Sequence, residues 1–353
     1  MGSAPPHYMQ LPREILIGSS VLAKLITVCQ SLGFQSSIFV VTGPHVYSMI
    51  TKEIIERLVV EGYHVNHSFV HSSDVQVMET TIGNLTQRSC EVVLGVGGGT
   101  VIDVAKISAS RIEKPFISIP TAASHDGIAS SRASLKGLDK PTSISTTAPL
   151  AILADTEVIL KAPYQLTAAG CGDIISKYTA VHDWELGHRY TNEYYGEYSA
   201  NLALMSARLI MKNAETIAKN TEESLRIVLE ALISCGVAMS IAGSSRPCSG
   251  AEHMFSHALD TIVDTPALHG EQCGIGAILI AYLQHRNWQK IREKLQIIGA
   301  PITASEMGIK DRYIIEALLQ AHTIRPQRFT ILGHEGITRK KAIEAATITG
   351  VIS

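Results

Sequence analysis

Three histidines and one aspartate in the second half of the chain have the residue types and spacing of a catalytic metal site. Asp173 follows the small residues Gly170-Cys171-Gly172, His253 and His257 lie four residues apart, and His269 stands in a further glycine-flanked stretch. On a helix, residues four apart project from the same face. One carboxylate and two imidazoles suit a catalytic zinc ion that keeps one position open for water or substrate.

Two simpler interpretations compete with this one. The helix of a metalloprotease would read His-Glu-x-x-His, but no glutamate follows His253, so that class is disfavoured. A single histidine in an apolar segment is more often a buried structural residue, and this would be preferred for each histidine alone. This structural interpretation is less convincing for the whole set, because three histidines and an aspartate recur beside glycines.

Hydride transfer is a reaction that such a metal would assist. A secondary alcohol must lose its proton as hydride leaves the carbon, and the free alcohol is a very weak acid at neutral pH. Zinc lowers the pKa of bound water from about 16 to about 7, and the same Lewis acidity would polarise a ketone. A nicotinamide would then carry the hydride.

A glycine run could hold the phosphates of such a dinucleotide. Gly97-Gly98-Gly99-Thr100 joins an apolar strand pattern to a helical one, where a backbone without Cβ atoms can approach a pyrophosphate near the start of a helix. The run is not Gly-x-Gly-x-x-Gly, so it could also be a tight turn. Asp103 and Lys106, one turn later, are expected to cap that helix or to form a solvated pair.

A second loop, from Pro120 to Gly127, is rich in small and hydroxyl residues and also follows a strand pattern. Such a loop can wrap a nicotinamide or its phosphates, and Asp126 could orient a substrate hydroxyl. Taken alone, the Asp126-Gly127 pair is more typical of an ordinary turn.

The composition limits the class of protein. The 353 residues predict about two domains, and 46% hydrophobic with 18% charged residues is typical of a globular chain. The net charge is −2 without a basic block, which argues against a nucleic-acid partner. Every apolar run of about 18 residues is interrupted by a charge, so we expect no membrane insertion.

The compartment is predicted from the first residues and the cysteines. Met1 to Gln10 lacks a basic segment followed by an apolar one, so we expect no leader and a soluble, cytoplasmic protein. The six cysteines are scattered without a Cys-x-x-Cys pair. This argues against both a disulfide framework and a thiolate zinc site.

The first half of the chain alternates strand and helix patterns, which predicts a parallel sheet. Helices are expected at Ile50–Val60 and Ile102–Ser110, and strands at Ser37–Val41, Tyr63–Val70, Glu91–Val96, Phe116–Pro120 and Leu150–Ala154.

The second half is expected to be entirely helical. Strand patterns disappear from about Leu160, and helical spacing continues through Ala200–Ala218 and Glu222–Met239. Pro163 marks a join, because proline disfavours helix at the residue before it and often begins one. We therefore predict an α/β domain over residues 1–160 and an all-α domain over residues 161–353.

Several segments spread along the chain resemble one known superfamily. They are Gly95–Gly99, Pro120–Ser130, Ala169–Asp173, Ala242–His257 and Leu268–Cys273. In these segments the chain resembles the iron-containing alcohol dehydrogenase and dehydroquinate synthase superfamily and, within it, the archaeal-type sn-glycerol-1-phosphate dehydrogenase family.

The resemblance implies a Rossmann-like α/β domain with a parallel sheet, packed on an all-α domain in the dehydroquinate synthase-like fold, with the active site in the cleft between them. It implies one zinc ion per subunit and NADP or NAD as cofactor. The reaction would be the reversible reduction of dihydroxyacetone phosphate to sn-glycerol 1-phosphate, the backbone of archaeal membrane ether lipids. We also expect a homo-oligomer.

The resemblance also assigns roles to residues. Asp173, His253 and His269 would bind zinc. Asp126, Asp173 and His257 would touch the substrate and form the catalytic set, with His257 orienting the substrate or relaying its proton. The dinucleotide would be contacted by residues of the two loops and the helix between them: Gly97, Gly98, Gly99, Thr100, Val101, Ile102, Asp103, Thr121, Ala122, Ala123, Ser124 and Ser130.

Two further expectations concern specificity. A phosphorylated substrate needs an anion site, and Arg246 is a candidate because a guanidinium can bind phosphate through two hydrogen bonds. An arginine packed against a loop carbonyl is an equally good interpretation.

The stretch Thr42 to His45 carries no carboxylate that would repel a 2′-phosphate, so we expect NADPH to be accepted at least as well as NADH.

Three other functions compete with this one. A dehydrogenase for unphosphorylated glycerol would share the metal and cofactor chemistry. A dehydroquinate synthase-like lyase would reduce and reoxidise the nicotinamide within one turnover, although its relatives usually carry glutamate where this chain has Asp173. A non-catalytic metal-binding or scaffold protein would leave the hydride and metal residues without a purpose.

Overall fold

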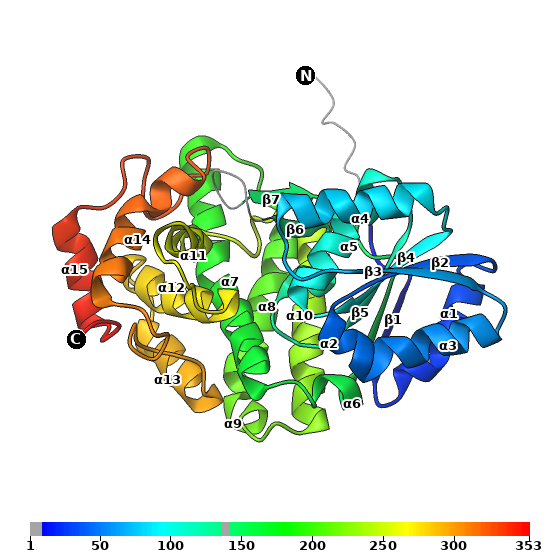
Figure 1. Cartoon of the computed structure of the whole chain (residues 1–353). Helices are drawn as coiled ribbons and strands as arrows, with labels where there is room; N and C mark the ends of the chain where they lie inside the picture. The colour runs from blue at the N-terminus through cyan, green and yellow to red at the C-terminus, as the bar shows by residue number, and fades with distance from the viewer. Residues whose placement is uncertain (1–8, 136–141) are drawn as a thin grey trace.

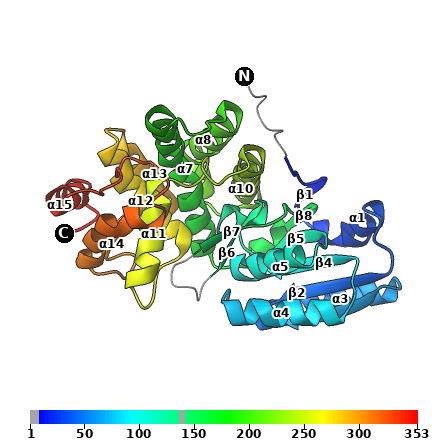
Figure 2. The same ribbon diagram turned by 90° about the horizontal axis from the view of Figure 1, so that it is seen from above.

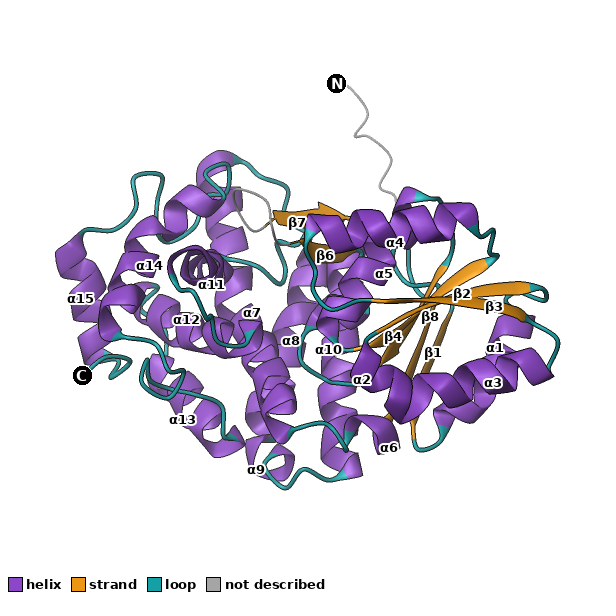
Figure 3. Cartoon of the chain, in the orientation of Figure 1, coloured by secondary structure: helices purple, strands orange, loops and turns teal. Residues whose placement is uncertain are grey.

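The computed structural model describes residues 9–135 and 142–353. It has two parts that lie side by side, a layered part with a β-sheet and a part built from helices (Figure 1). Figure 3 shows the main sheet at one end of the molecule and a separate pair of strands nearer to the helical part. Most of the segment Met1 to Gln10, where no leader was expected, lies outside the described residues.

The sheet has six parallel strands in the order β1-β8-β5-β4-β2-β3. Five of the six are predicted by the sequence; β1 is not, because it is a short edge strand that is only partly buried. A separate antiparallel pair, β6 and β7, was also not predicted. The strands are β1 (Glu14–Gly18), β2 (Ser37–Thr42), β3 (His64–Phe69), β4 (Val92–Gly97), β5 (Phe116–Pro120), β6 (Arg132–Leu135), β7 (Thr142–Ser145) and β8 (Ala151–Asp155).

Both faces of the sheet are covered, which explains the continuous apolar runs of its strands. In β2, Ile38 and Val40 pack in one core with residues of α1 (Leu25–Ser31) and α3 (Lys52–Val60). Phe39 and Val41 point to the opposite face and pack with α4 (Val75–Gln87) and α5 (Gly99–Arg111). Figure 2 shows the helices that flank the strands of this part.

The strand order reverses between β2 and β4, and this reversal creates a binding crevice. From β2 the chain crosses to β3 on one side, and it then returns to place β4 on the other side of β2. Connections that leave two neighbouring strands in opposite directions open a crevice at their carboxyl ends, where ligands bind in doubly wound folds. The glycine run lies at this end of β4.

Two helices of this part begin earlier than the sequence patterns predict. The helix expected from Ile102 starts at Gly99 as α5, directly after the strand. The helix expected from Ile50 starts at Pro44 as α2 (Pro44–Val46) and passes through a π-helical turn (Tyr47–Thr51) into α3. Short 3-10 turns cover Val21–Lys24 and Asp126–Ile128.

Residues 156–353 contain helices and no strand, as predicted. The long helix α7 (Tyr164–Thr191) follows Pro163 and packs along α8 and α12, and α11 packs against α12 and α14. The helices are α6 (Thr156–Ile159), α7, α8 (Glu197–Lys212), α9 (Ala214–Ile217), α10 (Glu222–Ala242), α11 (Ala251–Ile262), α12 (His269–Leu283), α13 (Trp288–Ile298), α14 (Asp311–Ile324) and α15 (Arg339–Ile348). The exact boundary of 160/161 between two domains stays a prediction.

One helix, α10, is long and apolar enough to cross a membrane by length and composition. Two-thirds of its apolar window (67%) is buried inside the molecule, where it packs against α7 and α8. It is therefore a core helix of this fold, which agrees with the expected lack of membrane insertion.

The expectation that Asp103 and Lys106 are solvated or cap a helix is wrong. Lys106 is fully buried, and its Nζ donates hydrogen bonds to the carbonyl oxygens of Gly127 (2.5 Å) and Arg132 (2.7 Å). Asp103 accepts a hydrogen bond from the backbone N–H of Ser134 at 3.1 Å. Together these two side chains tie α5 to the loop that follows β5, because buried carbonyl groups require partners.

Replacing the buried lysine tests this anchoring role. We expect Lys106→Met to lower the free energy of unfolding by about 2–5 kcal/mol, because two buried carbonyls and the Asp103 carboxylate lose their partner. Urea denaturation measures the change. The control is Lys52→Met, since the Lys52 side chain is 66% exposed, and its effect should stay within about 0.5 kcal/mol. Equal stability of the two variants would contradict the anchoring role.

Candidate active site

The predicted metal residues converge although they come from three different helices. Asp173 on α7, His253 on α11 and His269 at the start of α12 form one group with Cys273, and their potential ligand atoms all lie within 4.8 Å of one another. Asp173 Oδ1 lies 3.4 Å from His253 Nε2. A carboxylate oxygen and two imidazole nitrogens at this separation fit a divalent transition metal such as zinc.

Glycines allow this convergence, because they let α7 and α12 approach at backbone distance. A Cβ atom on Gly172 would lie 2.3 Å from the carbonyl oxygen of Gly270, and one on Gly270 would lie 1.9 Å from that of Ala169. Both distances are too short for any side chain. Asp173 follows Gly172 and His269 precedes Gly270, so the crossing point holds the two ligands together.

Neighbouring side chains orient each imidazole. His253 Nδ1 lies 2.9 Å from the Glu252 carboxylate, which leaves Nε2 directed at Asp173. His269 Nδ1 lies 3.1 Å from the Ser256 hydroxyl. Such outer partners fix the ring orientation of metal-binding histidines. Burial, followed by His253, lowers the pKa of His269 to about 3, so its ring is neutral and able to bind a metal.

A buried lysine balances two carboxylates at the centre of the site. Lys177 Nζ lies 2.5 Å from Asp173 Oδ1 and 2.8 Å from Asp126 Oδ2, and the Asp126 backbone N–H donates to Asp173 Oδ2 at 3.0 Å. Burial alone would raise the pKa of Asp173, but the Lys177 ammonium and His253 hold it well below the usual range. The carboxylate is therefore ionised, and the Asp126 side chain is not merely part of a turn.

His257 lies beside the metal residues, one helical turn beyond His253. Its ring stacks on that of His269 with the centroids 5.8 Å apart, and its Nδ1 lies 3.8 Å from the Asp260 carboxylate. It is not among the four residues that form the metal-binding group. The expectation that His257 contacts substrate rather than metal remains a prediction that this position permits.

Cys273 is the residue of this group that the sequence analysis missed. All six cysteines are free and buried. Cys273 nevertheless lies one turn beyond His269 on α12, with Sγ 3.5 Å from His269 Nε2. The expectation that zinc is not bound by a thiolate stays a prediction, although a cysteine belongs to the group of possible ligands. The four-residue spacing between His269 and Cys273 was a signal that could have found it.

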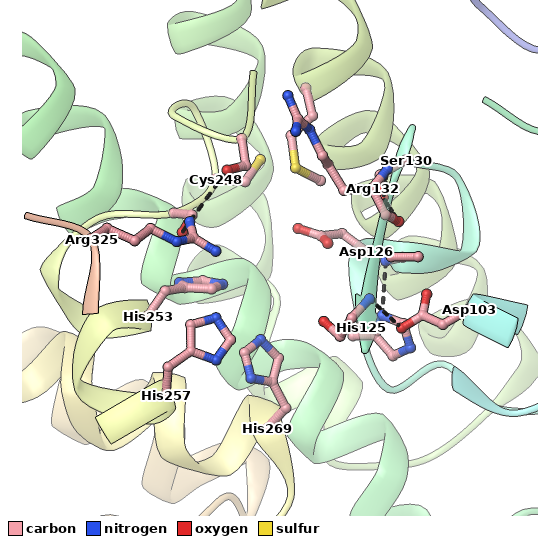
Figure 4. Close-up of a pocket in the computed structure, with 16 residues that line it drawn as sticks. Asp103, His125, Asp126, Ser130, Arg132, Cys248, His253, His257, His269 and Arg325 are labelled. Carbon is pink, nitrogen blue, oxygen red and sulfur yellow. Dashed lines mark hydrogen bonds between the residues drawn. The ribbon is translucent and has the colours of Figure 1, made fainter. Parts of the chain in front are cut away.

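His253, His257 and His269 line one side of a cleft between the two parts of the molecule. Figure 4 shows His253, His257 and His269 on one wall, facing Asp126, His125 and Asp103 on the other. Both walls are rich in polar groups. The lining residues are Asp103, His125, Asp126, Gly127, Ser130, Arg132, Ala133, Ser134, Met239, Ser245, Cys248, Ser249, His253, His257, His269 and Arg325.

The glycine run lies where a dinucleotide phosphate could be held. Gly98 is the N-cap of α5, and a Cβ atom added to it would meet nothing within 4 Å. Gly99 is covered by the ring of His125, whose Nε2 would lie 2.0 Å from a Cβ there. His125 was not predicted as a site residue, although it belongs to a loop that the sequence analysis singled out.

The other predicted cofactor residues occupy different surroundings. Val101 and Ile102 place their side chains in the core beneath α5, so only their backbone can face a dinucleotide. Ala123 is buried at the contact with α7, with its carbonyl against Gly170. Ser130 lines the cleft, and Thr121 donates its backbone N–H to the Gly97 carbonyl. Four further residues lie next to these in sequence: Gly97, Thr100, Ala122 and Ser124. Their contacts with the dinucleotide stay predictions.

Arg246, proposed from sequence to bind phosphate, points away from the cleft. It is 1% exposed, and its Nη2 donates to the carbonyl oxygens of Asp183 and Phe329 and to the Glu193 carboxylate at 2.7 Å. These contacts favour the packing interpretation, because through Nη2 the guanidinium joins α7 to the loop after α14. A phosphate contact of Arg246 stays a prediction.

Known proteins match the chain along its whole length. The profile of the iron-containing alcohol dehydrogenase family matches residues 16–163. A glycerol-1-phosphate dehydrogenase of Pyrococcus furiosus, with NAD(P)+ as its named cofactor, is 50% identical over 98% of this chain and 100% of its own length. A glycerol-1-phosphate dehydrogenase of Methanosarcina barkeri is 51% identical over 98% of this chain and 97% of its own length.

Solved structures share the fold at lower identity. Glycerol dehydrogenase of Schizosaccharomyces pombe superposes with a TM-score of 0.81 at 20% identity, covering 98% of this chain and 91% of that one. Maleylacetate reductase of Agrobacterium tumefaciens superposes with a TM-score of 0.78 at 16% identity, and the superposition covers 98% of both chains. These likenesses confirm the predicted fold, and the identity of about half to the relatives shows the family. The chain belongs to the glycerol-1-phosphate dehydrogenase family of NAD(P)-dependent oxidoreductases.

Proposed function

We propose that the chain interconverts dihydroxyacetone phosphate and sn-glycerol 1-phosphate, with NADPH or NADH as hydride donor and one zinc ion per subunit. The observation that carries the proposal is the convergence of Asp173, His253 and His269, of which the two histidines line the cleft between the two parts of the molecule. The full-length identity to glycerol-1-phosphate dehydrogenases supports the choice of substrate. We also propose a cytoplasmic homo-oligomer.

Asp173, His253 and His269 would hold the zinc, which when bound supplies Lewis acidity toward the oxygen of the reacting carbonyl. Reduction adds a hydride from the nicotinamide to carbon 2 of the substrate and a proton to its oxygen, which gives NAD(P)+ and the alcohol. The residues of the chain have to position these groups and exclude water. The buried cleft wall satisfies both requirements.

Asp126 binds and orients the substrate in this proposal. Lys177 fixes one oxygen of its carboxylate, and the side chain faces the cleft in Figure 4. A fixed carboxylate accepts hydrogen bonds from substrate hydroxyl groups. Asp126 would therefore hold the terminal hydroxyl of dihydroxyacetone phosphate and keep carbon 2 at the correct distance from the nicotinamide.

His257 moves or holds the proton. Its Nδ1 side is directed at Asp260, so its Nε2 is the atom available to the substrate oxygen or to a bridging water. Burial lowers the pKa of His257 although the Asp260 carboxylate opposes this effect, so the neutral ring can accept a proton and pass it on. This arrangement suits a relay between the reacting oxygen and solvent.

The competing functions have less support. The structural likeness to glycerol dehydrogenases is at 20% identity and establishes the fold alone. The carboxylate at the metal is Asp173, where the lyase would favour glutamate. A scaffold function would leave the cluster in which Lys177 contacts both Asp126 and Asp173 without a chemical role.

The decisive experiment offers sn-glycerol 1-phosphate, sn-glycerol 3-phosphate and glycerol separately to the zinc-loaded enzyme, each with NAD+ and with NADP+. We expect reduced nicotinamide to accumulate with sn-glycerol 1-phosphate and both cofactors, with NADP+ at least as effective as NAD+. Faster turnover of glycerol would establish the glycerol dehydrogenase instead. The absence of turnover with all three substrates would refute the proposed reaction.

The phosphate cradle is tested at Gly98. We expect Gly98→Ala to fold normally, because the new methyl group enters open space. It would occupy volume needed by the pyrophosphate, so the KM for NADPH should rise about 10- to 100-fold. Gly83→Ala, on α4, is the matched control, because its Cβ also meets nothing within 4 Å. An unchanged KM in Gly98→Ala would place the dinucleotide elsewhere.

The role of His257 is tested by separating metal content from turnover. We expect His257→Gln to lower kcat about 100-fold or more, since a proton-transfer group is lost. Bound zinc, measured by atomic emission after gel filtration, should remain near one ion per subunit. His253→Gln is the comparison, and it should lose zinc. Loss of zinc in His257→Gln would instead make His257 a metal ligand.

A further inference from the structure

Three arginines gather at the end of the cleft next to the metal-binding wall, and we call them the arginine corner: Arg132, Arg325 and Arg328. Arg325 follows α14 and lines the cleft, and Arg132 reaches the cleft from β6 in the other part of the molecule. Arg328 lies three residues beyond Arg325. Two parts of the fold therefore bring positive charge to one place.

Two serines bridge Arg325 and Arg328. Arg325 Nη1 donates to Ser249 Oγ at 3.0 Å and lies 3.5 Å from Ser245 Oγ. Arg328 Nη2 donates to Ser245 Oγ at 2.8 Å, and its Nη1 donates to the Ser249 carbonyl. Both serines line the cleft. In Figure 4 the Arg325 side chain extends into the cleft above His253.

The positive charge of the arginine corner is not neutralised by the protein. Among residues 9–135 and 142–353, no carboxylate lies within 4.0 Å of Arg132, Arg325 or Arg328. Arg246 differs, because Glu193 pairs with it at 2.7 Å. Burial, followed by the charge of Arg132, lowers the pKa of Arg325 to about 10. Partly buried cations without partners are costly, so this region favours a bound anion.

Arg325 also keeps hydrogen-bonding capacity for a ligand. Both of its hydrogen bonds within the described part of the chain are made by Nη1. The guanidinium carries five N–H donors, so Nε and Nη2 remain to bind an anion through two parallel bonds. Arg132 uses one nitrogen, with Nη2 donating to the Gly243 carbonyl at 3.2 Å.

The phosphate of the proposed substrate lies close to the carbon that is reduced. In dihydroxyacetone phosphate only one carbon and one ester oxygen separate the reacting carbonyl from phosphorus. Its phosphate must therefore bind in the cleft that holds the reacting carbonyl, beside the metal-binding wall. Arg325 lines that cleft together with His253 and His257, whereas Arg246 does not.

We propose that the substrate phosphate binds to Arg325, with Ser245, Ser249 and Arg132 as further donors. Arg328 acts as a positioning residue that holds the two serines. The site makes the enzyme selective for phosphorylated over unphosphorylated triose substrates. This assignment rests on the proposed function, because it names the residues that recognise one end of that substrate.

The test compares kcat/KM for dihydroxyacetone phosphate with that for dihydroxyacetone, using NADPH and zinc-loaded enzyme. In Arg325→Ala we expect the value for the phosphorylated substrate to fall about 30-fold or more, since a charge-assisted contact is lost. The value for dihydroxyacetone should change less than about 3-fold. Arg325→Gln, which is shorter and uncharged but stays polar and keeps one NH2 donor group, should show the same selective loss. Arg208→Ala, an exposed arginine on α8, is the charge-matched control.

The outcomes separate two kinds of failure. Wild-type enzyme that shows no preference for the phosphorylated substrate would refute the proposed function itself. Wild-type preference that survives in both Arg325→Gln and Arg325→Ala would overturn the phosphate site and leave the function intact. Equal losses on both substrates would also overturn it, because Arg325 would then serve only to hold the loop of Ser245 and Ser249. A thermal midpoint measured for each variant identifies misfolding, and in that event the Arg325→Gln result decides.

Discussion

The contact between the backbones of α7 and α12 is the constraint on which the active site depends. Gly172 and Gly270 have no room for a Cβ atom where the two helices cross. The residues next to them in sequence, Asp173 and His269, are brought together by this crossing. His253 then arrives from α11, which packs on α12. A larger residue at the crossing would separate the ligands by moving whole helices, since packed interiors transmit such changes.

Charge balance inside the protein is the second requirement. Asp126 and Asp173 lie almost wholly out of water, and Lys177 lies between them with its ammonium in contact with both. Although burial alone would lower the pKa of Lys177, the two aspartates raise it well above its ordinary value. Removing Lys177 would leave two carboxylates without the cation that they share, which costs several kcal/mol. The same network joins the loop after β5 to α7, and therefore joins the two walls of the cleft.

Much of this architecture could be predicted from sequence, because the relevant signals are local. Apolar runs predicted the buried strands, the glycine run predicted the turn from a strand into a helix, and Pro163 predicted the join to the helical part. Charged groups buried by distant contacts were predicted less well. The burial of Lys106 depends on carbonyl groups more than 20 residues away, and Arg246 and Arg325 look equally suited to phosphate until the fold shows which one lines the cleft. Cys273 was missed because its spacing from His269 gives only a neighbour on α12, whereas its proximity to Asp173 and His253 on other helices depends on the fold.

The most direct test of this account is the position of zinc in a crystal of the enzyme, located by anomalous scattering at the zinc absorption edge. We expect one peak per subunit with bonds of about 2.0–2.2 Å to a carboxylate oxygen of Asp173 and to one nitrogen each of His253 and His269. A zinc peak elsewhere, with these three side chains left unbound, would contradict the account.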